Sequence, residues 1–183
     1  MKGEKSTYLI AEIGSVHDGS IGNALKLIEL AATSGADCVK FQTHIAYSET
    51  LFDAPMPSFF KGEPRYEYFE RTGFSPDQWK QLKTKCKEQE IDFLSSPFSI
   101  DSVNLLEDVG VKHYKIPSGE VTNIPMLEYI AETKKPVLLS SGMSSWEELD
   151  DAVNTLLKVH SNITVMQCTS EYPCSYKNVG LNI

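Results

Sequence analysis

Two lysines stand at the ends of apolar, strand-like runs, where a positive charge needs a partner. Lys40 lies in the run 38–44 and Lys115 begins the run 115–120. Taking an ammonium group out of water costs several kcal/mol unless the charge is compensated. At the carboxyl end of a parallel strand, such a lysine can instead meet a bound anion. Polar residues stand at similar positions, and together they predict one site for a small phosphorylated or carboxylated metabolite: Glu12, Gln42, Ser96, Ser118 and Glu120.

The elements that must position these residues alternate between short apolar runs and amphipathic stretches. The pattern predicts strands at 8–14, 38–44, 91–96, 112–116, 136–141 and 162–167. It predicts helices at 23–34, 76–89, 100–109, 125–133 and 145–160. Ser75 before Pro76, and Ser145 with Glu148 three residues later, are typical of helix N-termini.

Six successive β/α units predict an α/β fold with a mostly parallel sheet covered by helices. Two architectures fit this pattern: an open doubly wound sheet and a (β/α)₈ barrel, the TIM barrel. No Gly-x-Gly-x-x-Gly follows the first strand, and polar residues end all six strands, which favours the barrel. Because six units do not close an eight-stranded barrel, we expect residues 1–183 to be a partial, truncated barrel domain.

Composition excludes several function classes. The 183 residues carry a net charge of −8 and no basic run, which argues against a nucleic-acid partner. No apolar stretch reaches the roughly 18 residues needed to span a bilayer, so no membrane partner is expected. The N-terminus lacks the apolar segment of a signal peptide, which predicts a cytoplasmic protein whose four cysteines are reduced thiols.

Three further expectations concern residues outside the predicted site. The segment 48–73 is the longest non-periodic stretch, and it is interpreted either as a lid or as an extra helix or subunit contact. His44 is expected to form hydrogen bonds rather than to bind a metal. Met143 is expected to pack in the core.

The sequence resembles the sialic acid synthase family, which includes the N-acetylneuraminate, legionaminic acid and pseudaminic acid synthases. The resemblance runs from Ile10 to about Asn182 and rests on ordered motifs. They are Ala11-Glu12-Ile13-Gly14 with His17-Asp18-Gly19, Val39-Lys40-Phe41-Gln42-Thr43, Ser95-Ser96-Pro97-Phe98-Ser99, Tyr114-Lys115-Ile116-Pro117-Ser118-Gly119-Glu120, Leu139-Ser140-Ser141-Gly142-Met143 and Gln167-Cys168-Thr169-Ser170-Glu171-Tyr172-Pro173.

The resemblance implies condensation of phosphoenolpyruvate with an N-acylated amino-sugar aldehyde, such as N-acetylmannosamine, with Mn²⁺ or Mg²⁺. It implies that one group of residues surrounds phosphoenolpyruvate: Lys40, Ser96, Lys115, Ser118 and Ser170. It implies that a second group faces the sugar or the reacting carbons: Glu12, Gln42, Glu120 and Tyr172. Glu12 and Glu120 are the expected catalytic carboxylates.

The sequence also departs from the family pattern. Val16 stands where the family often has Asn, and Ser96 and Ser170 stand where some members have Thr and Asn. The family's metal-binding histidines are expected beyond Ile183, as is a C-terminal antifreeze-like domain. We therefore expect no turnover from residues 1–183 alone, and an active homodimer for a full-length protein.

Two other functions remain open from the residues. In a class I aldolase, Lys40 or Lys115 would form a Schiff base, which needs an amine of lowered pKa. Alternatively, the fragment would bind phosphoenolpyruvate without turnover.

Overall fold

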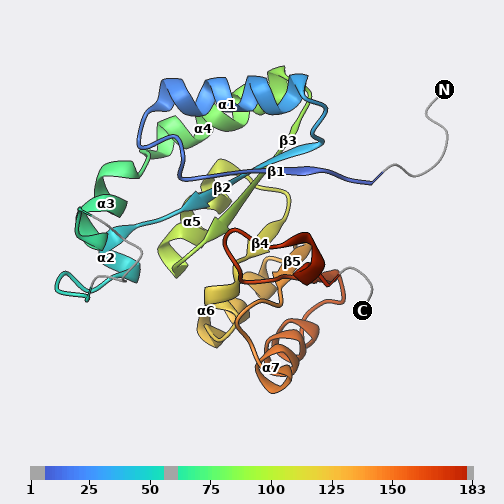
Figure 1. Cartoon of the computed structure of the whole chain (residues 1–183). Coiled ribbons are helices and arrows are strands. Elements are labelled where there is room, and N and C mark those ends of the chain that lie inside the picture. Colours follow the sequence, from blue (N-terminus) through green and yellow to red (C-terminus); the bar gives the residue numbers. More distant parts are fainter. Residues whose placement is uncertain (1–6, 56–61, 181–183) are drawn as a thin grey trace.

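The computed structural model describes residues 7–55 and 62–180, in which strands alternate with helices (Figure 1). All strand pairs are parallel, and they form two three-stranded sheets in the orders β1-β2-β3 and β4-β5-β6. The strands are β1 Ile10–Gly14, β2 Cys38–Thr43, β3 Asp92–Pro97, β4 Tyr114–Ile116, β5 Val137–Ser140 and β6 Ile163–Met166. β3 and β4 are in contact, but no backbone ladder joins them within the described ranges. The predicted α/β class and the parallel strand pairing are confirmed.

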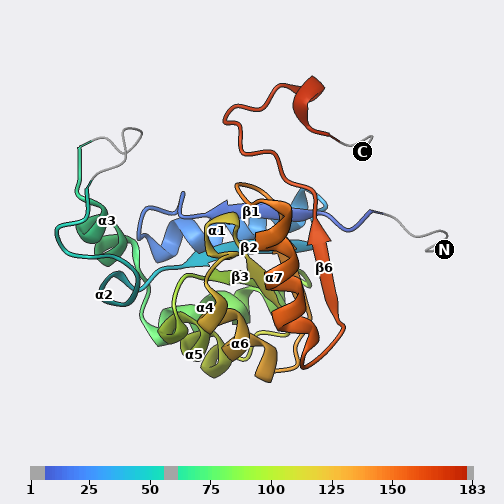
Figure 2. The same ribbon diagram turned by 90° about the horizontal axis from the view of Figure 1, so that it is seen from below.

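The helices lie in two groups beside the two sheets. α1 and α4 run side by side along the first sheet, and α6 and α7 pack together beside the second (Figures 1 and 2). The helices are α1 Ile21–Thr33, α2 Ala46–Glu49, α3 Arg65–Thr72, α4 Pro76–Glu88, α5 Ile100–Val109, α6 Ile124–Glu132 and α7 Trp146–Leu157, with 3-10 turns η1 Ser118–Glu120 and η2 Tyr176–Asn178. No helix among the described residues is long and apolar enough to cross a membrane.

The helix starts follow the capping residues of the sequence. Ser75 and Ser145 both form capping boxes, as predicted. α1 begins two residues earlier than predicted, because Ser20 accepts a hydrogen bond from the backbone N–H of Asn23. The fourth strand is shorter than predicted, since β4 begins only at Tyr114.

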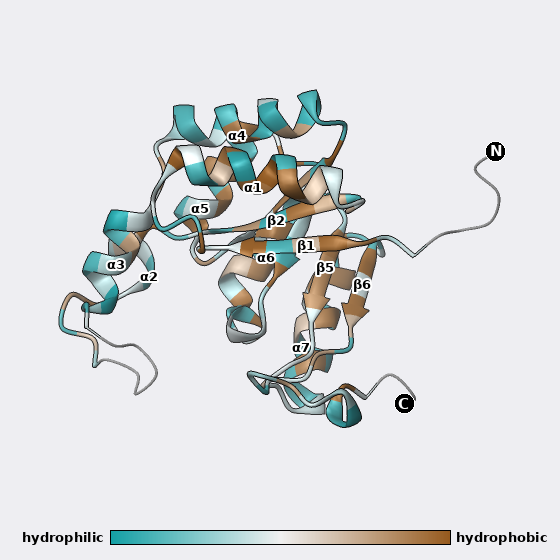
Figure 3. Cartoon of the chain, turned by 45° about the horizontal axis from the view of Figure 1, so that its top comes forward, coloured by the Kyte–Doolittle hydropathy of each residue, from teal (hydrophilic) through white to brown (hydrophobic). Residues whose placement is uncertain are grey.

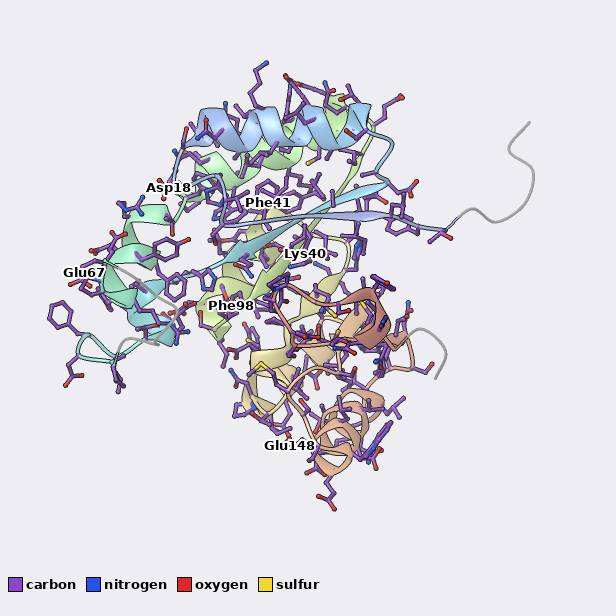
Figure 4. The ribbon with its side chains drawn as sticks, viewed as in Figure 1. Asp18, Lys40, Phe41, Glu67, Phe98 and Glu148 are labelled. Atoms are coloured by element: carbon purple, nitrogen blue, oxygen red, sulfur yellow. The ribbon has the colours of Figure 1, made fainter. Side chains whose placement is uncertain are left out.

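Alternation along β2 separates the core from the candidate site. Val39 and Phe41 are fully buried in the apolar cluster, where the Phe41 ring lies 6.0 Å from Trp79 of α4. Lys40 lies on the opposite side of the strand from Phe41 (Figure 4). Figure 3 shows that hydrophobic residues concentrate along the strands, while the outer face of α4 is hydrophilic. One face of the strand therefore packs the core, and the other carries polar side chains.

Two expectations from the sequence have different outcomes: the extra helix considered for the segment 48–73 is present, whereas the core position of Met143 is not. The segment 48–73 contains α3, and Phe69 of that helix is buried, with only 8% of its surface exposed; residues 56–61 of the segment lie outside the described part of the chain. The prediction that Met143 packs in the core is wrong. Met143 is 79% exposed because it occupies a left-handed turn, at φ +65°, that directs the side chain outward.

Candidate functional site

The first half of the site lies on one face of the first sheet, where Glu12 and Lys40 sit inside β1 and β2 rather than at the strand ends expected for Lys40. Lys40 is buried, with 9% of its surface exposed, and its Nζ lies 2.7 Å from Glu12 Oε2 of β1. The same Nζ donates a hydrogen bond of 3.3 Å to Ser96 Oγ of β3. Three neighbouring strands thus each contribute one polar group to the same point.

Lys115 of β4 forms the second half of the site, and its charge is not paired. Only 8% of the residue is exposed, and Nζ donates hydrogen bonds to the Ile116 carbonyl at 2.9 Å and to the Ser140 hydroxyl. No Asp or Glu oxygen of the described residues lies within 4.0 Å of it. Burial, and after it the positive charge of Lys40, lower the pKa of Lys115 to about 8, although the charges of Cys168 and Glu12 act in the opposite direction. The two lysines, although they come from different sheets, therefore face one region.

Gly142, directly after β5, lies where three side chains converge. A Cβ atom at this position would lie 2.7 Å from both Ser118 Oγ and Ser170 Oγ, and 3.3 Å from Cys168 Cβ. Real Cβ contacts are not found at 2.7 Å, so the absence of a side chain lets both hydroxyls lie against the backbone of Gly142. Gly142 lies two residues after Ser140, which accepts a hydrogen bond from Lys115, so the two hydroxyls are candidates to bind the same anion as Lys115.

We expect Gly142→Ala to weaken anion binding with little loss of stability. The backbone of Gly142 is outside the left-handed region, so alanine fits its conformation, but the methyl group displaces both serine hydroxyls. Losing one or two hydrogen bonds to a charged group costs about 2–4 kcal/mol, which lowers affinity by about 30- to 1,000-fold. Calorimetric titration with phosphoenolpyruvate checks this, and Gly119→Ala is the control, because a Cβ at Gly119 meets no atom within 4 Å. Equal affinities in the two variants would contradict the assignment.

The side chains of Gln42 and Glu12 both lie close to Gly14, the last residue of β1. A Cβ at Gly14 would lie 3.2 Å from Glu12 Oε1 and 3.7 Å from Gln42 Oε1. Ser15 donates a hydrogen bond of 3.2 Å to Gln42 Oε1, which fixes the orientation of the amide. Because Gly14 has φ +54°, a side chain there would also be strained.

Glu120 lies two residues after Ser118 on the turn η1, at the outer side of the site. Its Oε2 accepts a hydrogen bond of 2.8 Å from Asn123 Nδ2. Burial is the largest cause that raises the pKa of the Glu120 carboxyl, and the neighbouring Glu49 carboxylate raises it further. The Asn123 hydrogen bond and the charge of Arg65 act in the opposite direction. A carboxyl whose pKa is raised towards neutral suits proton transfer.

The model of the NeuB family matches residues 27–183. The chain belongs to the NeuB family.

Two curated relatives and one solved structure illustrate the NeuB similarity. The N,N'-diacetyllegionaminic acid synthase of Campylobacter jejuni is 40% identical, over 97% of this chain and 55% of that protein. The human N-acetylneuraminate-9-phosphate synthase is 31% identical, over 99% of this chain and 52% of that protein. The N-acetylneuraminic acid synthetase of Leptospira borgpetersenii, solved in complex with citrate, is 28% identical with a TM-score of 0.81, over 96% of this chain and 59% of that one. The chain spans about half the length of the curated relatives that it matches.

One residue expected in the NeuB site stands apart from the others. Tyr172 is 96% exposed, so its ring is not packed against the site. It lies on the segment after β6 that also carries Ser170, which does reach Gly142. The structure thus brings together Glu12, Lys40, Gln42 and Ser96 at the first sheet, and Lys115, Ser118, Ser170 and, next to them, Glu120 at the second.

Sequence reasoning missed two residues of the second half. Ser140 accepts a hydrogen bond from Lys115, and Cys168 Cβ lies close to Gly142. Burial acts to raise the pKa of the Cys168 thiol, but hydrogen bonds from Ser140 and two backbone N–H groups, with the charge of Lys115, bring it below its ordinary value. The signal was present, because Ser140 and Cys168 both end apolar strands in motifs that carry the NeuB resemblance.

A metal ion, which the NeuB resemblance implies, finds no ligand set among the described residues. No three His, Cys, Asp or Glu side chains in 7–55 and 62–180 lie together in a way that would hold one. Glu12 is ion-paired with Lys40, and His44 is bonded to Glu49.

Proposed function

We propose that the protein condenses phosphoenolpyruvate with an N-acylated amino-sugar aldehyde, N-acetylmannosamine or a similar sugar. The products are a sialic-acid-type nonulosonic acid and phosphate, and the six β/α units belong to a (β/α)₈ barrel. The unpaired, buried charge of Lys115 carries the proposal. It is an unfavourable arrangement for an empty protein, and a bound anion relieves it.

The proposed reaction balances without an oxidant or reductant. C3 of phosphoenolpyruvate forms a bond to the aldehyde carbon, and the aldehyde oxygen takes up a proton. Water adds to C2, where positive charge develops, and supplies that proton. The C2–O bond to phosphate then breaks, the remaining hydroxyl proton leaves with phosphate, and C2 becomes a ketone.

The side chains divide into an anionic-substrate side and a proton-transfer side. Lys40 and Lys115 would hold the phosphate and the carboxylate of phosphoenolpyruvate as point charges. Ser96, Ser118 and Ser170 would add neutral hydrogen-bond donors. Glu12, held next to Lys40 at 2.7 Å, would orient the water and stabilise the positive charge at C2. Glu120, with its raised pKa, would transfer a proton to the aldehyde oxygen.

A Schiff-base aldolase is the second candidate, and one observation favours it. A lysine whose pKa is lowered to about 8 is partly neutral near physiological pH, as an amine nucleophile must be. Borohydride reduction in the presence of pyruvate would then attach the pyruvate carbons to Lys115 or Lys40. In the condensation we propose, no such adduct forms.

The deciding experiment follows phosphate release and nonulosonic acid formation from phosphoenolpyruvate. The sugars are N-acetylmannosamine and a legionaminic-type precursor, with Mn²⁺ or Mg²⁺ present. Because the relatives are about twice as long, we expect turnover in a full-length protein and none in residues 1–183, which would bind phosphoenolpyruvate only. Turnover by residues 1–183 would contradict the placement of essential groups outside them. A borohydride-trapped adduct, or no turnover in any version, would overturn the condensation.

A further inference from the structure

One cysteine next to Lys115 has no part in the proposed condensation. The four cysteines of the chain are free thiols: Cys38 and Cys86 are buried, and Cys168 and Cys174 are half-buried. Cys168 follows β6, and its Cβ lies 3.3 Å from the position that a Cβ on Gly142 would take. Cys168 is therefore a thiol within the proposed anion site.

The sulfur of Cys168 lies among hydrogen-bond donors at the end of β5. The Ser140 hydroxyl and the backbone N–H groups of Ser141 and Gly142 are directed at it. The backbone N–H of Cys168 in turn donates to Ser141 Oγ at 3.3 Å, which holds the residue against the end of β5. When the thiol is protonated, it donates to the Met166 carbonyl at 3.4 Å. Three donors around one sulfur favour the thiolate over the thiol.

Lys115 is a second, independent reason for negative charge at this point. Only 8% of the residue is exposed, and no carboxylate of the described residues lies within 4.0 Å of its Nζ. The Nζ donates to the Ser140 hydroxyl, so one hydroxyl connects the ammonium group to the sulfur. Burial raises the pKa of the Cys168 thiol, yet the three donors and the charge of Lys115 bring it below its ordinary value. A buried cation without a carboxylate and a readily ionised thiol are thus joined.

The other three cysteines lack this environment. Cys174 is half-buried like Cys168 and lies on the same segment, but burial and the neighbouring Glu171 carboxylate raise the pKa of its thiol. Cys38 and Cys86 are almost fully buried, and burial raises the pKa of each thiol to about 12. Cys174 therefore matches Cys168 in exposure class and differs from it in electrostatics.

A hollow gives small molecules access to Cys168. It has a volume of about 480–590 Å³ by comparison with neighbouring hollows, itself about 590 Å³, and Cys168 is on its lining between the ends of β5 and β6 and the start of α7. Trp146 and Val165 also line it, and they are 83% and 48% exposed, so the hollow is open to solvent. A reagent as small as hydrogen peroxide can therefore reach this residue.

We infer that Cys168 is a modification site: small electrophiles, with hydrogen peroxide as the oxidant, react with its sulfur and thereby block the binding of phosphoenolpyruvate. In the oxidation, the sulfur attacks one peroxide oxygen, an S–O bond forms and the O–O bond breaks. The sulfur loses two electrons and becomes a sulfenic acid. The other oxygen leaves as hydroxide and takes up the thiol proton to become water. A dithiol such as dithiothreitol reduces the sulfenic acid back to the thiol.

The added oxygen would occupy space that the anion needs. The Ser118 and Ser170 hydroxyls lie 2.7 Å from the position of a Cβ on Gly142, and Cys168 Cβ lies 3.3 Å from it, so little room is free around this backbone. An oxygen on the sulfur would displace a hydroxyl, or accept the hydrogen bonds that an anion accepts in the proposed function. The inference rests on the proposed function in this step alone, because the reactivity of Cys168 does not depend on which anion binds.

The first test measures the reaction of each thiol with iodoacetamide, in which a C–S bond forms and iodide leaves. Peptide mass spectrometry gives separate rates for Cys168 and Cys174 in one sample at pH 7. We expect Cys168 to react about 10-fold faster, because a larger fraction of it is thiolate. Saturating phosphoenolpyruvate should slow the reaction of Cys168 and leave that of Cys174 unchanged.

Lys115→Met tests the electrostatic part of the inference. Without the ammonium group, the alkylation rate of Cys168 at pH 7 should fall by about 3- to 10-fold, while that of Cys174 stays the same. Lys112→Met is the control, because Lys112 is exposed and lies before β4. If the substitution acted only by loosening the structure, Cys168 would become more accessible and its rate would rise.

The second test connects the modification to binding. The protein is treated with hydrogen peroxide, the sulfenic acid is identified by its adduct with dimedone, and a parallel sample is titrated calorimetrically with phosphoenolpyruvate. Treatment is expected to weaken binding by at least about 10-fold, and dithiothreitol should restore it. In Cys168→Ser, whatever its affinity, the values with and without peroxide should be equal.

The outcomes separate the inference from the proposed function. The inference is overturned, and the condensation stands, if Cys168 reacts no faster than Cys174 or if its rate does not fall in Lys115→Met. The same holds if peroxide leaves the affinity of the parent protein unchanged or weakens binding equally in Cys168→Ser. If the untreated protein does not bind phosphoenolpyruvate, the proposed function is overturned and the block of binding with it, while the iodoacetamide rates still decide whether Cys168 is the reactive thiol.

Discussion

Lys115→Met is expected to lower kcat/KM for the condensation by about 100- to 1,000-fold. This is the range expected when one partner of a buried charge pair is removed, here the lysine that would bind the anionic substrate. Methionine matches the length and shape of the aliphatic stem, so the substitution removes the charge and little else. Affinity for phosphoenolpyruvate is expected to fall with it, measured by calorimetric titration. Lys112→Met is the control, because Lys112 is exposed and precedes the same strand at its amino end. If Lys115→Met kept its activity, the buried charge of Lys115 would not be needed for substrate binding, and the main support for the proposed function would be lost.

The same substitution is expected to raise the free energy of unfolding, although it lowers activity. The pKa of Lys115 is about 8 in the folded protein and near 10.5 when unfolded, so the folded state holds fewer protons between these values. The free energy of unfolding therefore rises with pH across that window, and below about pH 8 the group destabilises the fold by up to about 3 kcal/mol. Urea titrations at pH 7 and pH 10 check this: Lys115→Met gains stability at pH 7, and its advantage disappears at pH 10. A variant less stable than the parent at pH 7 would show that a partner already neutralises the lysine.

His44→Ala is expected to lower the free energy of unfolding by about 3–5 kcal/mol, the range for a buried charge that loses its partner. The imidazole lies between Phe69 and Phe98, with centroid distances of 3.9 and 4.0 Å. Its Nδ1 is 2.7 Å from Glu49 Oε1, and both side chains are buried. Alanine leaves a cavity between the two rings and a carboxylate with one remaining donor, the backbone N–H of Ile45.

Two further variants separate the cavity from the charge. His44→Phe fills the space between the rings and still removes the partner of Glu49, so it should recover only the packing part of the loss. The double variant His44→Ala with Glu49→Ala should cost less than the two single losses added together, because no unpaired carboxylate remains. A loss below about 1 kcal/mol in His44→Ala would mean that α2 is not held by this pair.

Local patterns were enough to predict most elements of the fold. α5 has the bounds that were predicted, and Ser75 and Ser145 cap their helices as expected, because capping depends on residues three positions apart. The shortening of β4 could not be predicted in this way. The register of β4 depends on its pairing with β5, through residues such as Ile116 and Leu139 that are distant in sequence.

The sequence was enough to predict which residues form the candidate site, but not which of their side chains contact one another. A lysine in or next to an apolar run was sufficient to single out Lys40 and Lys115, although the structure places both inside β2 and β4 rather than at the strand ends. The partner of Lys40 at Ser96 is 56 residues away, and spacing carries no information on such a contact. His44 was correctly expected to form a hydrogen bond, but its position between two phenylalanines arises from three elements that meet only in the fold.

The boundary between the two sheets, where β3 and β4 are in contact without a backbone ladder, would give a bound substrate a structural role. Lys40 belongs to one sheet and Lys115 to the other, and no backbone ladder crosses between the sheets in the described residues. An anion bound by both lysines would therefore connect the two sheets. Part of its binding free energy would then stabilise the contact between β3 and β4. In the proposed function, the substrate would stabilise the fold as well as react.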